Sequence, residues 1–396
     1  MIIQPKIRGF ICTTAHPEGC AKNVTEQVDY VAGKGRFSGP KNVLVIGAST
    51  GYGLASAITA MFGANANVIG IFFEKVADDK RTASPGWYNM AAFEELARRQ
   101  GHYFKGINGD AFSNEIKKQA AELIRRDLKQ VDLVIYSLAS PRRIHPETGE
   151  IFTSSLKPIG KPFTGKTVDA FKGEVKEVTI EPATEKDIEH TVAVMGGDDW
   201  ERWMDYLLQE NLLSNGVKTV AYSYLGPQLT HAIYKEGTIG RAKVHLKATA
   251  DHLTKKLAGL HGEALVSVQK AVVTQASAAI PVVPLYISIL FKVMKEKGLH
   301  EGCIEQIYRL FTMYLYASQP AKRDGEGYAR LDDWEMRDDV QAAVTSLWPQ
   351  VTTENLAALT DVEGYRNDFY RLFGFNMEGI NYDQEVDPMV EMESVK

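Results

Sequence analysis

The sequence predicts an α/β protein built on a doubly wound parallel sheet. Short and almost wholly apolar runs, such as VLVIG (43–47) and VIGIFF (68–73), alternate with helix-like segments. Such runs are typical of parallel strands, which helices cover on both faces. A glycine-rich turn joins the first run to the first helix. The 396 residues, 44% of them hydrophobic, suffice for a single enlarged domain with a large core, which we assign to 1–396.

The first half of the chain repeats the strand and helix order. After the strand in VLVIG come a helix in 48–63, a strand in 68–75, a strand in YFKGIN (103–108), a helix in 114–128 and a strand in VDLVIYSLAS (131–140). We therefore expect 40–140 to form the dinucleotide-binding half. Residues 141–191 are rich in Gly, Pro, Thr and Lys, which indicates an insertion with a β-hairpin rather than a linker.

The second half continues the sheet and then becomes helical. Strand character returns in TVAYSYLG (219–226) and ALVSVQKAVVTQAS (264–277), with a helix between them that begins near Thr238, the predicted N-cap. We assign 192–320 to the catalytic and substrate-binding half and 321–396 to a helical C-terminal extension. The apolar stretch 277–291 is shorter than the ~20 residues of a membrane span, so we expect a buried helix opened by Pro284. The last dozen residues are acidic, which favours loose packing.

Charge and cysteine content exclude several classes of protein. A formal net charge of -5 gives no basic field for nucleic acid or for anionic membranes. Three cysteines are too few for a disulfide framework, and the first twenty residues resemble no export signal, so we expect a cytoplasmic protein. Cys12, His16 and Cys20 are evenly spaced, but without a fourth ligand or zinc-like spacing they predict no metal site.

The glycine turn is the clearest functional motif. Gly47, Gly51 and Gly53 lie between a strand and a helix, where glycines allow a tight turn and let a pyrophosphate approach the helix N-terminus. Glu74 ends the next strand, where a carboxylate can bind an adenosine ribose and repel a 2′-phosphate. This context favours a Rossmann-like NAD site over a merely structural turn.

The ends of two later strands offer further contacts. Asp110 and Ala111 follow the third strand, where an aspartate can meet the adenine, and Leu138 and Ala139 follow the fourth, where small residues leave room beside a cofactor. By position alone, each of these four residues is as well suited to packing as to contact.

A tyrosine and a lysine form an unusually wide pair. Eight residues separate Tyr234 from Lys243, and residues nine apart lie on opposite faces of one continuous helix. The pair can cooperate only if the helix begins near Thr238 and Tyr234 lies on the loop before it. Lys243 projects within about 40° of the helix's apolar stripe, so it either reaches the edge or serves a buried polar site. Tyr224 ends a strand on the side where such sheets bind ligands, although a packed aromatic would look the same.

Together these motifs resemble the trans-2-enoyl-CoA reductases, including the FabV-type enoyl-acyl-carrier-protein reductases. The resemblance rests on IGASTGYGLA, GWYN, GDAFS, YSLASP, VMGG, AYSYLG, the Y-x8-K pair and VVTQASAAIP, and it extends over nearly the whole chain. It implies a monomeric, NADH-dependent enzyme on an enlarged scaffold similar to that of the short-chain dehydrogenases. Its substrate would be an enoyl-CoA or an enoyl-acyl-carrier protein.

The resemblance also assigns residues. It implies that Tyr234 is the proton donor, that Lys243 binds the cofactor and that Tyr224 meets the substrate. The implied NADH contacts are Gly47, Ala48, Ser49, Thr50, Gly51, Tyr52, Phe73, Glu74, Asp110, Ala111, Leu138, Ala139, Lys243, Val272, Val273 and Thr274.

Two other activities remain open on the residues alone. A ketoreductase or alcohol dehydrogenase would use a tyrosine and a lysine on a carbonyl, but normally holds them one helical turn apart. A dinucleotide-sensing protein without turnover would need neither residue. We also expect Ile280 to Leu290 either to line an acyl pocket or to form ordinary core.

Overall fold

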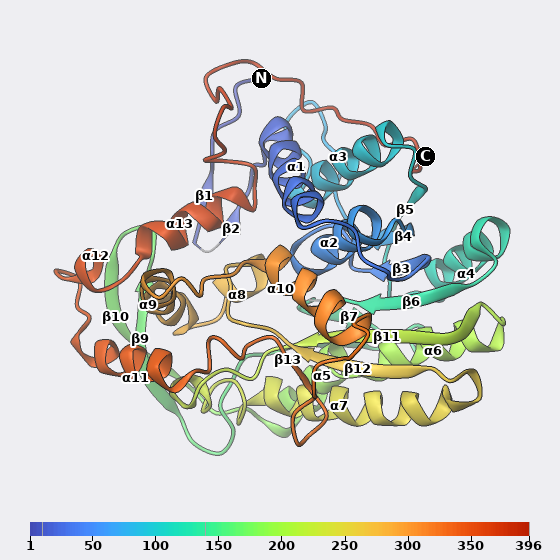
Figure 1. Ribbon diagram of the computed structural model, residues 1–396. Coiled ribbons are helices and arrows are strands. Elements are labelled where there is room, and N and C mark those ends of the chain that lie inside the picture. The colour runs from blue at the N-terminus through green and yellow to red at the C-terminus, as the bar shows by residue number, and fades with distance from the viewer. Residues whose placement is uncertain (10, 139, 396) are drawn as a thin grey trace.

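The computed structural model describes residues 1–9, 11–138 and 140–395. A seven-stranded sheet, with every pair of neighbours parallel, forms its centre (Figure 1). Its strands, in spatial order, are β13 (Ala329–Arg330), β12 (Glu263–Val268), β11 (Leu213–Ser223), β6 (Val131–Tyr136), β3 (Asn42–Ile46), β4 (Asn67–Phe72) and β5 (Phe104–Asn108).

This strand order confirms the doubly wound fold. The first strand of this sheet along the chain is β3, and the next two, β4 and β5, lie on one side of it. The later strands β6, β11, β12 and β13 lie on the other side. The order therefore reverses between β3 and β6. Open α/β sheets bind ligands in the crevice at the carboxyl ends of such strands, and the glycine turn follows β3 directly.

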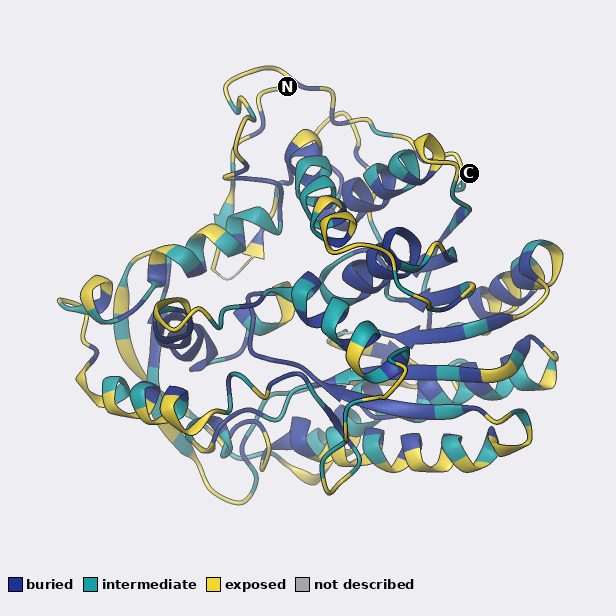
Figure 2. Ribbon diagram, viewed as in Figure 1, coloured by how far each residue is buried: buried dark blue, intermediate teal, exposed yellow. Residues whose placement is uncertain are grey.

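Alternate residues of each strand enter two different cores. In β3, Val43 and Val45 belong to one cluster of buried side chains, whereas Leu44 and Ile46 belong to another. This alternation follows from the two-residue period of a strand. The first cluster includes α1 (Pro17–Lys34), α2 (Gly51–Ile58), α3 (Pro85–Arg99) and α10 (Cys303–Arg309). The second includes α4 (Asn114–Leu123), α6 (Asp198–Gln209) and most of the inward face of α7 (Thr238–Lys256). Figure 2 shows the strands buried between these layers.

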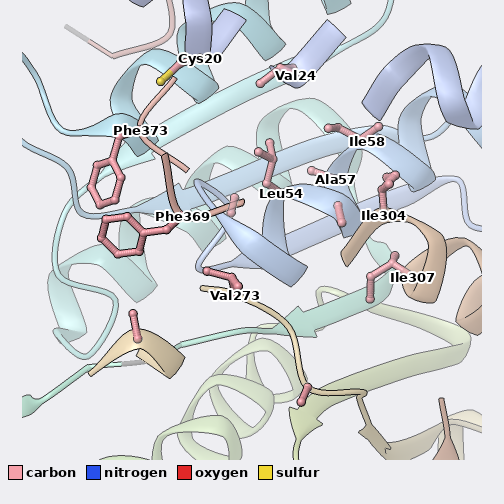
Figure 3. Packing of buried hydrophobic residues seen from close by; sticks show 14 of the residues in the cluster. Cys20, Val24, Leu54, Ala57, Ile58, Val273, Ile304, Ile307, Phe369 and Phe373 are labelled. Carbon is pink, nitrogen blue, oxygen red and sulfur yellow. The ribbon is translucent and has the colours of Figure 1, made fainter. Parts of the chain in front are cut away.

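The helix after the glycine turn is held by the later part of the chain. Leu54 and Ile58 of α2 share a cluster with Ile304 and Ile307 of α10 (Figure 3). Phe369, from α13 (Val362–Arg371), belongs to the same cluster. Burial of such side chains stabilises by about 1.5–3 kcal/mol each, so the C-terminal helices contribute to the core around the glycine turn. The division into functional halves stays a prediction.

The insertion contains two β-hairpins where we expected one. One pairs β7 (Arg142–Ile144) with β8 (Ile151–Thr153), and the other pairs β9 (Phe163–Asp169) with β10 (Glu174–Ile180). The helix α5 (Glu185–Met195) begins before residue 191, and Thr184 caps it in a reciprocal capping box with Asp187. Lys166 of β9 donates to the carbonyl oxygens of Pro349 and Val351, which ties the second hairpin to the C-terminal extension.

The C-terminal part of the chain is mostly helical, as predicted. The strand before it, β12, is shorter than predicted. The remaining helices are α8 (Gln275–Ala278), α9 (Val283–Glu296), α11 (Asp338–Leu347) and α12 (Leu356–Leu359). Pro284 lies in the first turn of α9, and the helix is buried as expected. The predicted strand over 264–277 is wrong beyond Val268, because the chain leaves the sheet there and the side chain of Thr274 caps α8.

The expected loose packing of the acidic tail is wrong. Trp87 and Tyr88 of α3 donate to the carbonyl oxygens of Val390 and Pro388, and the backbone of Gly106 donates to Ser394 Oγ. Met392 is buried, so apolar and hydrogen-bonding side chains hold the tail despite its charge. At the other end, the strand pair of β1 (Ile7–Arg8) and β2 (Ile11–Cys12) precedes α1.

Within the described ranges, no helix combines the length and the apolar character that a membrane crossing requires.

Candidate active site

Two glycines of the turn are required by the backbone itself. Gly47 has φ +88°, and a Cβ added there would lie 2.2 Å from the carbonyl oxygen of Ser137. A Cβ at Gly53 would lie 1.8 Å from the Gly47 carbonyl oxygen, because α2 crosses directly over the turn. The N-cap residue Thr50 makes no side-chain capping bond with the described residues. The first N–H groups of α2 are therefore available to an anion such as a pyrophosphate.

Glu74 is held in place beside this turn. Ser49 Oγ donates to Glu74 Oε1 at 2.6 Å, and Ser84 donates to Oε2. Asn108 fixes the backbone, since its amide donates to the Glu74 carbonyl and accepts from the Glu74 N–H. Burial raises the pKa of Glu74, and the two serine hydroxyls oppose that shift. The carboxylate thus lies next to the glycine turn at the end of β4, where the prediction placed it.

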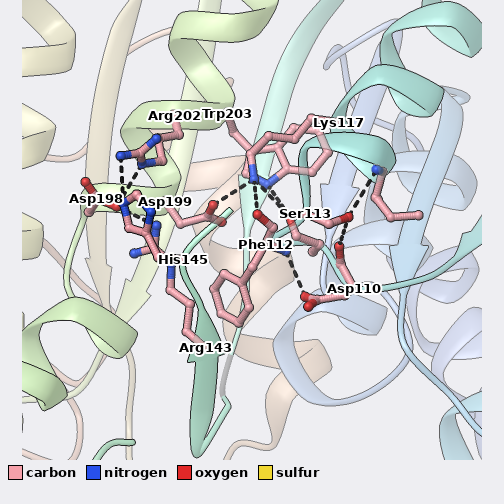
Figure 4. A network of polar contacts seen from close by, with 12 residues as sticks. Asp110, Phe112, Ser113, Lys117, Arg143, His145, Asp198, Asp199, Arg202 and Trp203 are labelled. Carbon is pink, nitrogen blue, oxygen red and sulfur yellow. Dashed lines mark hydrogen bonds and ion pairs between the residues drawn. The ribbon is translucent and has the colours of Figure 1, made fainter. Parts of the chain in front are cut away.

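The segment after β5 is anchored through a buried ion pair (Figure 4). Lys117 Nζ lies 2.8 Å from Asp199 Oδ1 and also donates to the carbonyl oxygen of Ala111. Trp203 Nε1 donates to the same carbonyl oxygen. Ala111 is buried, whereas Asp110 is half-buried and accepts from the backbone of Phe112. Ala111 therefore packs, and Asp110 keeps an accessible side chain.

The other predicted cofactor residues lie beyond the carboxyl ends of the strands. The Leu138 side chain lies 3.2 Å from where a Cβ of Gly47 would stand, and Tyr52 donates its hydroxyl to the Lys270 carbonyl oxygen. Val272 and Val273 are buried after β12, and Thr274 caps α8. Phe73 is 76% exposed and has room for a ligand. Ala139 lies outside the described residues.

The structure places the start of α7 between the tyrosine and the lysine. Tyr234 lies in the turns over 231–236, and α7 begins at Thr238, so the condition for cooperation is met. The predicted N-cap role of Thr238 is wrong, because Gly237 is the N-cap. The Thr238 hydroxyl donates to the Ser155 carbonyl and accepts from Lys157 N–H, so it fastens the helix to the insertion.

Tyr234, Lys243 and Tyr224 line one pocket. The rings of Tyr224 and Tyr234 meet edge to face with centroids 5.0 Å apart. Lys243 is half-buried on the inner side of α7, and its Nζ lies 3.3 Å from the Tyr222 carbonyl oxygen. Asp324, Tyr328 and Arg330 also line this pocket. The three residues from separate segments therefore face a common space, as the resemblance implies.

Burial changes the acidity of these groups. It raises the pKa of the Tyr234 phenol well above its usual value and lowers the pKa of Lys243 to about 8. The charged form of each group is less stable away from water, which explains both directions. Tyr234 therefore stays protonated at neutral pH. Lys243 loses its proton at a pH of about 8.

Two residues beside the site, Glu335 and Gln341, were not predicted from the sequence because they lie far from the motifs in the chain. Glu335 accepts from the hydroxyls of Tyr224 and Tyr286, and Gln341 donates to Tyr286. Residues 332–339 read as a charged, solvated segment, so the pattern gives no sign that Glu335 is fully buried.

The helix α9 does not reach the pocket. None of the residues 280–290 lines the space beside Tyr234 in the described part of the chain, and Leu285, Ile287 and Leu290 are fully buried in the core cluster. The packing favours the alternative of ordinary core for these side chains.

The chain is similar to several known proteins. Two family models match: the NAD(P)H binding domain of trans-2-enoyl-CoA reductase over residues 2–79, and the trans-2-enoyl-CoA reductase catalytic region over residues 81–316. An enoyl-[acyl-carrier-protein] reductase [NADH] of Coxiella burnetii is 61% identical over 390 residues, which cover 98% of this chain and 96% of that protein. One of Flavobacterium johnsoniae is 60% identical over the full length of both. The crystal structure of Treponema denticola trans-2-enoyl-CoA reductase in complex with NAD superposes with a TM-score of 0.95 at 52% identity, covering 99% of this chain and 100% of that one.

A third family model, the enoyl reductase FAD binding domain, matches residues 323–386. The residues of this segment do not fit a flavin. No described strand in it leads through a glycine turn into a helix, the arrangement that binds a dinucleotide pyrophosphate. Its helices instead bury Val340, Val344 and Phe369 in the core.

Proposed function

The chain belongs to the trans-2-enoyl-CoA reductase family, and from that premise we propose that its pocket reduces the 2,3-double bond of trans-2-enoyl thioesters with NADH. The observation that carries this proposal is the convergence of Tyr224, Tyr234 and Lys243 on one pocket at the carboxyl edge of the sheet. The glycine turn and Glu74 lie at the same edge and supply the determinants of an NAD site.

The chemistry that NADH supplies when bound is a hydride for C3 of the enoyl thioester. Negative charge then develops on the thioester oxygen, and hydrogen-bond donors at that oxygen stabilise it. In our proposal the buried Tyr234 donates its proton to the enolate, which becomes the saturated acyl thioester, with Tyr224 beside it at the oxygen. The raised pKa of Tyr234 keeps its proton in place until the enolate forms.

Lys243 would hold the nicotinamide ribose, and its charge would favour release of the Tyr234 proton. Gly47 to Tyr52 would cradle the pyrophosphate, with Phe73, Glu74, Asp110 and Ala111 at the adenosine end. Leu138 and Val272 to Thr274 would complete the cofactor wall.

Loss of NADH with defined thioesters tests this function. We expect the purified protein to oxidise NADH with crotonyl-CoA and not with an acetoacetyl thioester. Oxidation with only the keto substrate would instead identify a ketoreductase. No oxidation with either would favour a dinucleotide sensor without turnover.

Glu74 is expected to set the preference for NADH. Glu74→Gln keeps the shape and one serine hydrogen bond, reverses the other because its amide nitrogen donates, and loses the charge that repels a 2′-phosphate. Hydrogen bonds to charged groups contribute about 1.5–3 kcal/mol, so we expect the ratio of kcat/KM for NADH over NADPH to fall about tenfold or more. Glu174→Gln, an exposed glutamate of β10, is the matched control. An unchanged ratio in Glu74→Gln would remove Glu74 from the discrimination.

The pH dependence should report Lys243. Its lowered pKa means that the ammonium is lost as the pH rises through about 8. Cofactor affinity should therefore fall above that pH. Lys243→Arg, which stays charged, should keep NADH affinity constant over the same range. A wild-type affinity for NADH that is flat through pH 8 would contradict this role.

We further propose a monomer in the cytoplasm that acts on an enoyl-CoA or an enoyl-acyl-carrier protein. The net charge of -5 and the few cysteines support this setting. Light scattering of the eluting protein measures the mass, and a value of twice 43.9 kDa would exclude the monomer.

A further inference from the structure

Glu335 is a buried acid beside the pocket for which the proposed chemistry has no use. Its side chain has no exposed surface. Oε1 lies 3.0 Å from the Tyr224 hydroxyl and 2.6 Å from the Tyr286 hydroxyl, and Oε2 accepts from the Ala271 N–H at 2.7 Å. Each polar atom of the carboxyl group thus has a partner, and one of those partners is a pocket tyrosine.

Two of the three hydrogen bonds to Glu335 have a clear donor, Tyr286 in one and the Ala271 N–H in the other. Gln341 Nε2 lies 2.7 Å from the Glu335 carbonyl oxygen, which can only accept, so this atom is the amide nitrogen and donates. The same nitrogen lies 3.2 Å from the Tyr286 hydroxyl and donates to it as well. Tyr286 keeps its own hydrogen for Glu335, the donation made across their 2.6 Å contact. Ala271 N–H can only donate, so the bond between Glu335 and Tyr224 is the one whose direction depends on the ionisation of Glu335.

That remaining bond decides what Tyr224 offers the pocket. An ionised Glu335 accepts the Tyr224 hydrogen, and Tyr224 then presents only lone pairs to a ligand. A neutral Glu335, protonated on Oε1, donates to the Tyr224 oxygen and leaves the Tyr224 hydrogen for the pocket. An oxygen that gains negative charge during reduction needs a donor, so only the second arrangement assists the reaction.

We propose that Glu335 is a positioning residue that is neutral in the working enzyme and directs the Tyr224 hydroxyl hydrogen toward the thioester oxygen. The chain of donors runs from Gln341 through Tyr286 and Glu335 to Tyr224. This inference rests on the proposed function, because it takes the thioester oxygen as the group that Tyr224 meets.

The charges around Glu335 are compatible with a neutral acid. Burial raises its pKa, and the charge of Asp332 on the same segment acts in the same direction. The Tyr286 hydroxyl of α9, the Lys270 ammonium after β12 and the Ala271 N–H oppose the shift without reversing it. Lys270 donates to the Ala271 carbonyl oxygen, and its own burial lowers its pKa to about 8. Tyr224, the remaining titratable group that faces Glu335, has a raised pKa and stays protonated.

Infrared difference spectroscopy tests the ionisation directly. Subtraction of the Glu335→Gln spectrum from that of the wild type isolates the carbonyl stretch of a protonated Glu335 from those of other buried acids. We expect this band at the pH of maximal turnover, with its loss at higher pH. Tyr286→Phe removes one donor that stabilises the carboxylate, so it should move the loss of the band to higher pH. This second variant decides the question even if Glu335→Gln does not fold.

Turnover of crotonyl-CoA supplies the functional readout. We expect wild-type kcat to fall about 10²-fold as the band disappears, the usual effect of losing one donor at a developing oxyanion. Glu335→Gln, which cannot ionise, should retain only the fall that Lys243 causes. The matched control is Glu301→Gln, which removes a buried glutamate paired with Arg309 and should leave the pH profile unchanged.

Absence of the band at the pH of maximal turnover would overturn the proposal, as would turnover that does not follow the band. Failure of the wild type to reduce crotonyl-CoA would instead overturn the proposed function, and the spectra would still report the state of Glu335.

Discussion

Tyr234→Phe is expected to lower kcat by about 10²–10⁴-fold, the range for loss of a general acid, while NADH binding stays unchanged. Phenylalanine fills the same space, so the edge-to-face contact with Tyr224 is kept and only the hydroxyl is lost. Burial is the one cause that raises the Tyr234 pKa, and no described side chain donates to or accepts from its hydroxyl. The variant therefore breaks no internal hydrogen bond of the described structure and should fold normally.

The measurement is steady-state NADH oxidation with crotonyl-CoA, together with the NADH dissociation constant from calorimetry. Tyr365→Phe, at another buried tyrosine, in α13, controls for loss of a phenol elsewhere in the core and should turn over normally. Turnover of Tyr234→Phe within a few-fold of the wild type would remove Tyr234 from the mechanism.

The sequence alone predicted the parallel sheet and the strands that form most of it. Parallel strands are buried on both faces, so β3 and β4 appear in the sequence as almost wholly apolar runs. The glycines of the turn are required by steric contacts that are local to the turn. The start of α7 between Tyr234 and Lys243 was also predictable, because two glycines lie between them. In each of these cases the decisive interaction is local in the chain.

The predictions fail where contacts with residues far away in the chain determine the local structure. Thr238 was the better N-cap by residue type, but its hydroxyl is used by Ser155 and Lys157, so Gly237 takes the position. The acidic tail packs because Trp87 and Tyr88 supply donors about 300 residues away. Glu335 and its chain of donors combine three distant segments, at Tyr224, Tyr286 and 335–341. Periodicity within any one of these segments carries no trace of the others.

The buried ion pair of Lys117 and Asp199 joins two segments that are far apart in the chain. We expect Asp199→Ala to destabilise the protein and to disturb the predicted cofactor site. Both side chains are almost fully buried, with 4% and 2% exposed. Removal of the carboxylate leaves the ammonium without its counter-charge in the interior, which typically costs about 3–5 kcal/mol. It also leaves the Tyr136 hydroxyl without an acceptor. We expect the free energy of unfolding in urea to fall by this amount.

Lys118 of α4, next to Lys117, provides the control that separates this effect from the loss of an exposed ion pair. Lys118 forms an i,i+4 pair with Glu122 in which both side chains are mostly exposed, so Lys118→Ala should leave stability almost unchanged. Lys117→Met combined with Asp199→Leu should recover part of the loss, since neither charge is then buried alone. Because Lys117 also binds the carbonyl oxygens of Ala111 and Phe112, Asp199→Ala should weaken NADH binding as well. Equal stability losses in the Asp199 and Lys118 variants would show that the buried pair does not hold this loop.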